Sequence, residues 1–331
     1  AAFWEAAMSA ELPGCHRYLN RIAPPPLIPV RLDPALPAVW CKLEFLNPSG
    51  STKDRIARFI LEKAWRQGRL KCGDLVVEAS SGSTSIALAL ACAQMGVKFL
   101  AVMPEGVSNE RVFIIRAYGG DVSFTPKDAG IRGAIAEVFR MGEHSRDREG
   151  GRGEGSRVFL PRQFANMDNP EAHRVGTARE VIDQIPGGRV DAVVSGVGTG
   201  GTLVGMFQGL NECGGNVLPV MARPVNLMST PDAECCSFSA RIPGVADAIS
   251  EIFREDRLPG LMTVEVPDED AIATTRELIR LGFPVGPSSG LNYRAACEAI
   301  RRLGDPNAQV VTVFPDRMER YFTTELFKPF I

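Results

Sequence analysis

Continuous apolar runs alternate with amphipathic stretches along most of the chain. Helical periodicity predicts helices near residues 54–67, 84–95, 108–118, 129–141, 170–185, 201–212, 269–281 and 290–303. Nine β-rich runs are predicted as strands: "AVWCKLEF", "DLVVEA", "VKFLAVM", "GDVSFT", "SRVFLP", "VDAVVSG", "NVLPVMA", "LMTVEV" and "QVVTVF". Several of these runs are apolar without alternation, which is typical of parallel strands covered by helices on both faces. The pattern therefore predicts an α/β protein with open, mostly parallel sheets, in which ligands bind at the carboxyl ends of the strands.

One segment, Gly142–Arg157, interrupts this pattern. Its sequence "GEHSRDREGGRGEGSR" is charged, rich in glycine and nearly devoid of apolar residues. Such composition cannot supply a packed face, so the segment is predicted to be a flexible surface loop without secondary structure. It falls near a plausible seam between an early sheet and a later one.

Composition excludes several classes of function. The net charge of the 331 residues is −2, and no basic stripe marks a surface for nucleic acid or anionic membrane. The longest apolar run, Ile86–Ala93, is far shorter than the about 20 residues of a membrane span, and no export signal precedes it. The eight cysteines form no CxxC pair and the three histidines stand apart, so reduced thiols, no metal site and a cytoplasmic location are expected.

Three loops of glycine and hydroxyl residues each follow a predicted strand and precede a helix. The first, "NPSGSTKDR", carries the spacing of a capping box, Ser51-x-x-Asp54, which places Lys53 in the first helical turn. The second is "SSGST" within Glu78–Ala89, and the third is "GVGTGG" within Val193–Gly205. Glycines allow close backbone approach, and a helix N-terminus offers N–H groups to an anion. The third loop is therefore predicted to bind a phosphate or carboxylate.

The residues alone leave one alternative function open. Gly196-x-Gly198-x-x-Gly201 fits the dinucleotide fingerprint, and the next strand is predicted to end at Arg223, which could accept a 2′-phosphate. An NADP-dependent oxidoreductase therefore remains an alternative. By contrast, "GPSSG" fits a hydrolase nucleophile elbow, but no histidine follows Ser288, so that interpretation fails.

Taken together, "NPSGSTKDR", "SSGST", "GVGTGGT" and "GPSSG" resemble the cysteine synthase and cystathionine β-synthase family of pyridoxal-phosphate (PLP) enzymes, which are tryptophan synthase β-like and of fold type II. The resemblance extends from about Leu27 to Phe327 and includes the closing "VVTVFPDRMERYFTT". It implies two open, twisted, mostly parallel sheets flanked by helices, with the active site between two domains. Residues 43–157 would form the smaller, mobile domain, and residues 1–42 plus 158–331 the larger PLP-binding domain. A homodimer is implied, with serine acetyltransferase as a candidate partner by family analogy.

The resemblance also assigns the site residues. Lys53 would carry PLP as a Schiff base and act as the catalytic base, and the positive end of its helix favours the neutral amine that this chemistry requires. The residues implied to bind the cofactor are Lys53, Ser83, Gly198, Thr199, Gly200, Gly201, Thr202 and Ser288, where Ser288 faces the pyridine nitrogen. The residues implied to bind the substrate carboxylate are Ser80, Ser81, Gly82, Thr84 and Gln163.

The implied reaction is β-replacement on O-acetyl- or O-phospho-L-serine by sulfide or another small nucleophile, through an aminoacrylate. Ser83 stands where the family usually has asparagine, so a shorter side chain or a water would reach the phenolic oxygen of the cofactor. Ala246 stands where the active-site cover, Ser239–Phe253, commonly has glycine. These departures keep β-elimination, such as cysteine desulfhydration, and a specialised amino-acid synthase as alternatives.

Overall fold

The computed structural model describes residues 12–13, 18–149, 157–226, 241–242, 245 and 249–330. The chain divides into two compact units. Unit 1 contains the described residues up to Ala23 together with Lys53–Gln163, and unit 2 contains Pro24–Thr52 together with the described residues from Phe164 onward. The division is not the one that the family resemblance implies, in which the smaller domain spans residues 43–157. Pro24–Thr52 belong to unit 2, and at the end of this segment the Thr52 N–H donates to the Pro315 carbonyl of the same unit.

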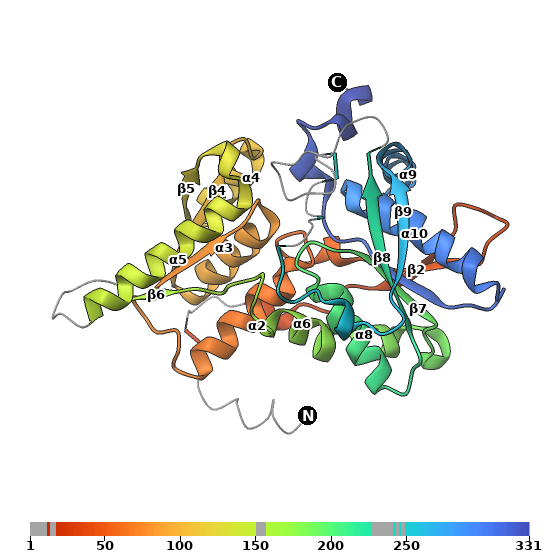
Figure 1. Cartoon of the computed structure of the whole chain (residues 1–331), viewed down its shortest axis with the longest axis horizontal. Coiled ribbons are helices and arrows are strands. Elements are labelled where there is room, and N and C mark those ends of the chain that lie inside the picture. Colours follow the sequence, from red (N-terminus) through yellow and green to blue (C-terminus); the bar gives the residue numbers. More distant parts are fainter. Residues whose placement is uncertain are drawn as a thin grey trace. The chain divides into compact units, whose positions relative to one another are not determined.

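Unit 1 is built on a four-stranded parallel sheet in the order β5-β4-β3-β6. The strands are β3 (Leu75–Ala79), β4 (Lys98–Pro104), β5 (Asp121–Thr125) and β6 (Val158–Phe159). The helices of this unit are α2 (Lys53–Arg66), α3 (Ser83–Met95), α4 (Asn109–Ala117) and α5 (Gly130–Glu149). Side chains of α5 pack on Val77, Ala79 and Val102 on one face of the sheet. Helix α3 contacts β3, β4 and α2 (Figure 1).

Unit 2 is built on a six-stranded sheet in the order β1-β2-β10-β7-β8-β9. All neighbours are parallel except β1 and β2. The strands are β1 (Leu27–Val30), β2 (Val39–Lys42), β7 (Ala192–Gly196), β8 (Leu218–Val225), β9 (Met262–Pro267) and β10 (Val310–Val313). The helices are α6 (Asp168–Ala172), the π-helix η5 (His173–Thr177), α7 (Ala178–Gln184), α8 (Gly201–Glu212), α9 (Asp268–Arg280) and α10 (Pro287–Leu303).

Two apolar cores cover the two faces of this sheet. One combines sheet residues such as Val194 and Val310 with the buried sides of α9 and α10, and the other combines Val193 and Val311 with α7 and α8. Alternate strand residues point to opposite faces, so the uninterrupted Val-rich runs supply both cores. Short 3-10 helices complete the described chain at Leu19–Arg21, Glu44–Leu46, Lys127–Ala129, Pro186–Gly188, Glu255–Arg257, Met318–Tyr321 and Glu325–Phe330.

The predicted α/β class with mostly parallel sheets is confirmed, and each of the nine predicted strands forms. Three local predictions were wrong. Strand β1 was missed, β8 continues past Arg223 to Val225, and Gly142–Glu149 is helical because α5 extends to Glu149. The arginine and glutamate residues that suggested a loop are good helix formers. Residues 150–156 lie outside the described residues.

No helix among the described residues is long and apolar enough to cross a membrane.

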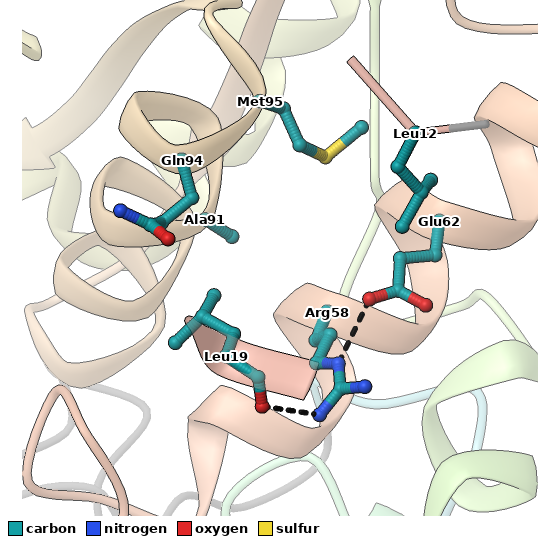
Figure 2. A pocket seen from close by; sticks show the side chains of 7 residues that line it. All are labelled: Leu12, Leu19, Arg58, Glu62, Ala91, Gln94 and Met95. Atoms are coloured by element: carbon teal, nitrogen blue, oxygen red, sulfur yellow. Dashed lines mark hydrogen bonds and ion pairs between the residues drawn. The ribbon is translucent and has the colours of Figure 1, made fainter. Parts of the chain in front are cut away.

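Unit 1 contains a small cavity between α2 and α3, near the described N-terminal residues (Figure 2). Arg58 closes one side, because its guanidinium donates to Glu62 Oε1 at 2.8 Å and to the Leu19 carbonyl at 3.0 Å. The cavity volume is about 20 Å³. That volume suits a single water and is too small for an amino acid or a cofactor. The cavity is therefore not the functional site.

Candidate active site

The glycine loop of unit 2 lies between the end of β7 and the start of α8. Gly200 precedes the helix with φ +80°, a left-handed conformation that favours glycine. The Gly201 N–H is bound to Thr199 Oγ1 at 3.3 Å, whereas among the described residues the N–H groups of Gly198 and Gly200 have no acceptor. Backbone N–H groups that converge at the start of a twelve-residue helix form an anion site.

Side chains from α6 and η5 support this loop. Asn169 Nδ2 donates to Thr199 Oγ1 at 2.9 Å, and His173 Nε2 lies 3.3 Å from Thr202 Oγ1. His173 is buried, and its other ring nitrogen lies 2.9 Å from Thr177 Oγ1. Sequence reasoning missed both residues, because an isolated asparagine or histidine carries no signal of what it contacts.

Helix α8 also packs unusually closely against the segment that contains these supporting residues. A Cβ added at Gly201 would overlap the Asn169 side chain, and one at Gly205 would overlap the Pro170 carbonyl. A Cβ at Gly209 would overlap the Arg174 carbonyl. Each glycine therefore allows a backbone approach that no other residue permits.

Lys53 is the first residue of α2, so its predicted place in the first helical turn is confirmed. The helix begins one residue later than the Ser51–Asp54 capping box predicts. Ser51 instead forms an antiparallel bridge with Asp316. Lys53 thus follows directly on a loop that is fixed to the C-terminal part of unit 2.

Arg320 is the main support of this loop and is only 3% exposed. Its guanidinium donates to the Gly50 carbonyl at 3.0 Å and also to the Ser49 carbonyl. Gly50 has φ +80°, and a Cβ there would press on the Arg317 side chain. The sequence carried a signal for this role, because Arg320 lies within the closing "PDRMERYFTT" of the family resemblance.

The second hydroxyl loop, Ser80–Thr84, connects β3 to α3 in unit 1. Ser81 is exposed at its tip, while Ser80 is buried and its Oγ accepts from the Gly82 N–H at 3.0 Å. The Ser81 carbonyl accepts from Arg111 at 2.8 Å. The structure also brings the predicted Gln163 to this loop, because Thr84 Oγ1 donates to Gln163 Oε1 at 2.6 Å.

Glu78, which sequence reasoning missed, lies one residue before Ala79 at the end of β3. Its carboxylate accepts the Ala79 N–H and the Gln163 N–H, both at 2.9 Å. Burial raises the pKa of Glu78 to about 7, although backbone N–H groups and the nearby Arg162 charge oppose this shift. A buried acid therefore lies beside a predicted substrate-binding residue.

The adjacent serines of "GPSSG" occupy the first turn of α10 but differ in exposure. Ser288 is 9% exposed, whereas Ser289 is 0% exposed and its Oγ has no hydrogen-bond partner among the described residues. A hydroxyl that binds a ligand must be reachable. Exposure thus favours Ser288, the predicted partner of the pyridine nitrogen, over Ser289.

These features fit PLP as a cofactor. The glycine cradle suits a phosphate, the lysine at a helix start suits an aldehyde, and the Ser288 hydroxyl in the first turn of α10 suits a ring nitrogen. Among the described residues no group of three His, Cys, Asp or Glu could hold a metal ion. Of the predicted cover segment, Ala246 lies outside the described residues.

Comparisons with known proteins agree with this fit. Residues 19–316 match the family model "Pyridoxal-phosphate dependent enzyme". The chain is similar to cysteine synthase B of Campylobacter jejuni, with 36% identity over 292 residues that cover 87% of this chain and 91% of the relative. The glycine loop therefore belongs to a PLP enzyme, and the NADP-dependent alternative is not supported.

Two solved structures share the fold over most of their length. The O-acetylserine dependent cystathionine β-synthase from Helicobacter pylori is 30% identical with a TM-score of 0.79, covering 93% of this chain and 97% of that one. A hydrogen sulfide-producing enzyme from Fusobacterium nucleatum is 32% identical with a TM-score of 0.77, covering 88% of this chain and 84% of that one. The chain belongs to the pyridoxal-phosphate dependent enzyme family, as a fold type II enzyme of the β-replacement type whose cofactor is PLP.

Proposed function

We propose that the enzyme replaces the β-substituent of an activated L-serine, either O-acetyl- or O-phospho-L-serine, with sulfide or another small nucleophile. The observation that carries this proposal is the 36% identity with a cysteine synthase across 87% of the chain. The name of the Helicobacter pylori structure, which specifies O-acetylserine, supports an activated serine as the first substrate.

The residues of unit 2 would hold the cofactor. The N–H groups at Gly198–Thr202 bind the phosphate, and the Asn169 and His173 side chains keep Thr199 and Thr202 in place. The Ser288 hydroxyl donates to the pyridine nitrogen. Because a neutral hydroxyl does not keep that nitrogen protonated, it favours elimination and replacement over transamination. When bound, PLP would supply an aldehyde for the substrate amine and an electron sink for Cα.

The residues of unit 1 would act on the amino acid. The Lys53 amine would hold the cofactor through its aldehyde and would take up the Cα proton as the general base. The Ser80–Thr84 loop, with Gln163 bound to Thr84, receives the substrate carboxylate at the start of α3. Ser83 reaches toward the cofactor phenolic oxygen, directly or through a water.

The test is to incubate the purified, PLP-supplemented enzyme with O-acetyl- and O-phospho-L-serine, with and without sulfide. Cysteine should form only when sulfide is present, and Lys53→Ala should abolish both the visible Schiff-base absorbance and turnover. An enzyme that stays colourless with PLP, or a Lys53→Ala variant that turns over normally, would refute the proposal.

The second candidate is β-elimination, and the similarity to a hydrogen sulfide-producing enzyme favours it. The same lysine and carboxylate loop would serve both reactions, because they diverge only after the β-substituent leaves. Release of sulfide and pyruvate from cysteine, with no cysteine formed from activated serine, would select elimination. Incorporation of a nucleophile other than sulfide would select a specialised amino-acid synthase.

We propose further that the enzyme is a cytoplasmic homodimer. The five described cysteines are unpaired, which suits a reducing compartment. Light scattering should give twice the 35.8 kDa mass of the chain. Binding of serine acetyltransferase is proposed on family analogy alone and is tested by co-elution with the purified enzyme.

A further inference from the structure

The chain leaves the sheet after β6 and enters a turn at Gln163. Pairing between β3 and β6 ends at Val76 and Phe159. Pro161 then follows, which has no N–H to offer a sheet, and Arg162 has φ +57°. Arg162 is the one non-glycine residue among the described residues with a positive φ, a strained conformation that persists only where neighbours enforce it.

The Glu78 carboxylate takes the place of the missing sheet partner. One of its oxygens accepts the Ala79 N–H and the other accepts the Gln163 N–H, both at 2.9 Å. A carboxylate offers two acceptor oxygens and no donor, which suits several converging N–H groups. A glutamine here would offer one oxygen and turn an NH₂ group toward the other N–H.

The backbone held by Glu78 fixes the Gln163 side chain. Gln163 Nε2 donates to the Ala79 carbonyl at 2.7 Å, and its Oε1 accepts from Thr84 Oγ1 at 2.6 Å. A carbonyl can only accept, so the amide nitrogen must face Ala79 and the oxygen must face Thr84. Gln163 thereby joins the end of β3 to the first turn of α3, on either side of the Ser80–Thr84 loop.

Stability alone does not account for an acid at this position. Glu78 is 2% exposed, and the hydrogen bonds it receives come from backbone N–H groups. A buried carboxylate without an ion pair is costly, and an apolar residue would serve the strand better, as Val76 and Val77 do. The acid is therefore matched to the turn at Arg162–Gln163 and not to the core.

We propose that Glu78 is a positioning residue that orients Gln163 and the Ser80–Thr84 loop for the substrate carboxylate. This inference deepens the proposed function and rests on it for the assignment of the loop to the substrate. Glu78 itself touches neither substrate nor cofactor. Its effect passes through the backbone of Arg162–Gln163 and the amide of Gln163.

The first test compares Glu78→Gln with Asp74→Asn. Asp74 is another buried carboxylate of unit 1, just before β3, and it accepts from Lys71 N and Arg157 without contacting Gln163. Glu78→Gln should raise KM for the activated serine by about tenfold or more, as expected when one or two buried hydrogen bonds are lost. KM for sulfide and the visible PLP absorbance should not change, and Asp74→Asn should keep the wild-type KM. An unchanged KM in Glu78→Gln overturns the proposal.

The second test is a double-mutant cycle with Gln163→Ala. If Glu78 acts through Gln163, the double variant is no worse than Gln163→Ala alone, because residues that act as one unit are not additive. Additive losses overturn the proposal. If Glu78→Gln does not fold, Glu78→Asp carries both tests, since it keeps the charge but withdraws the carboxylate by one methylene group.

The third test does not depend on turnover. Hydrogen exchange of a peptide spanning residues 158–166 reports the N–H groups of Arg162 and Gln163. Exchange there should accelerate in Glu78→Gln and not in Asp74→Asn. Unchanged exchange in Glu78→Gln would show that Glu78 does not hold this backbone, which overturns the proposal.

An enzyme without activity on activated serine refutes the proposed function, and a spectral titration with L-serine then decides whether Glu78→Gln weakens amino-acid binding. Equal binding by wild type and variant overturns the positioning role.

Discussion

The guanidinium of Arg320 donates to the carbonyl of Gly50, 270 positions earlier and three residues before Lys53. This contact ties the C-terminal motif to the loop that leads into the lysine helix. The arginine is buried and always charged. It therefore supplies these carbonyls with strong hydrogen bonds at a position that water does not reach.

Replacing Arg320 by methionine should therefore loosen the loop before Lys53. The loss of charge-assisted hydrogen bonds to two buried carbonyls should lower the free energy of unfolding by about 2–4 kcal/mol. PLP occupancy should fall with it, as measured by visible absorbance alongside urea unfolding. The matched control is Arg317→Ala, which removes a half-exposed ion pair to Glu319 and should change stability by less than about 1 kcal/mol. Equal losses in both variants would show that Arg320 has no special role.

Gly201→Ala should disrupt the phosphate loop by overlap with the Asn169 side chain. We expect PLP affinity to fall by about tenfold or more, measured by cofactor titration of the apoenzyme. Adding Asn169→Ala should recover part of that affinity, since it removes the overlapping amide at the cost of the bond to Thr199. The overlap is not the cause if the double variant regains no PLP affinity while Asn169→Ala alone keeps the wild-type affinity.

The two serines of α10 should respond differently to alanine substitution. Ser288→Ala should shift the absorbance of bound PLP and reduce turnover, because it removes the hydroxyl that we propose as the donor to the pyridine nitrogen. Ser289→Ala should leave the spectrum unchanged and stabilise the fold by about 1 kcal/mol, because it removes a buried hydroxyl without a partner among the described residues. A spectral shift in Ser289→Ala, with none in Ser288→Ala, would show that Ser289 and not Ser288 interacts with the pyridine nitrogen.

Glu78 should make the stability depend on pH. Burial raises its pKa from 4.5 to about 7, so the folded protein binds this proton more tightly than the unfolded chain. Its stabilising contribution is full below pH 4.5 and is lost as the pH rises to about 7. The loss amounts to about 3 kcal/mol at 1.36 kcal/mol per pKa unit. Urea unfolding of wild type and Glu78→Gln at about pH 5 and about pH 8 measures this difference.

The control for this pH effect is Glu137→Gln, for which the opposite sign is expected. The hydrogen bond from Arg140 holds the pKa of Glu137 below its ordinary value. Its contribution is therefore present at neutral pH and lost as the pH falls through that lowered pKa. A wild-type advantage over Glu78→Gln that grows from pH 5 to pH 8 would contradict the prediction for Glu78.

Local pattern was enough to predict most of the fold. Apolar runs such as "VDAVVSG" are buried on both faces in the parallel sheets, so sequence and structure agree. Strand β1 was missed because "PPPLIPVRLDP" is dense in proline, which is tolerated in an edge strand such as this antiparallel one. The segment after Gly142 was misread because charge suggests solvent exposure but does not oppose a helix.

Short motifs predict candidate site residues, whereas contacts with distant residues cannot be predicted from them. Motifs predict Lys53 and Ser288 as site residues, and the structure places each in the first turn of a helix. Glu78 could not be found in this way, because an acid in "LVVEA" is typical of a solvent-facing strand position. Its contact with Gln163, 85 positions away, is seen only in the structure. His173 could not be predicted either, because its role depends on its contacts with Thr177 and Thr202, which the sequence does not show.

The column of Gly201, Gly205 and Gly209 along α8 restricts how this enzyme can be altered. A Cβ at Gly205 or Gly209 would overlap the Pro170 or Arg174 carbonyl, so a larger residue at either position would push α8 away and shift the glycine loop at its start. Attempts to engineer acceptance of a bulkier amino acid should therefore leave this helix untouched. They should concentrate on Ser81, which is exposed at the tip of the Ser80–Thr84 loop.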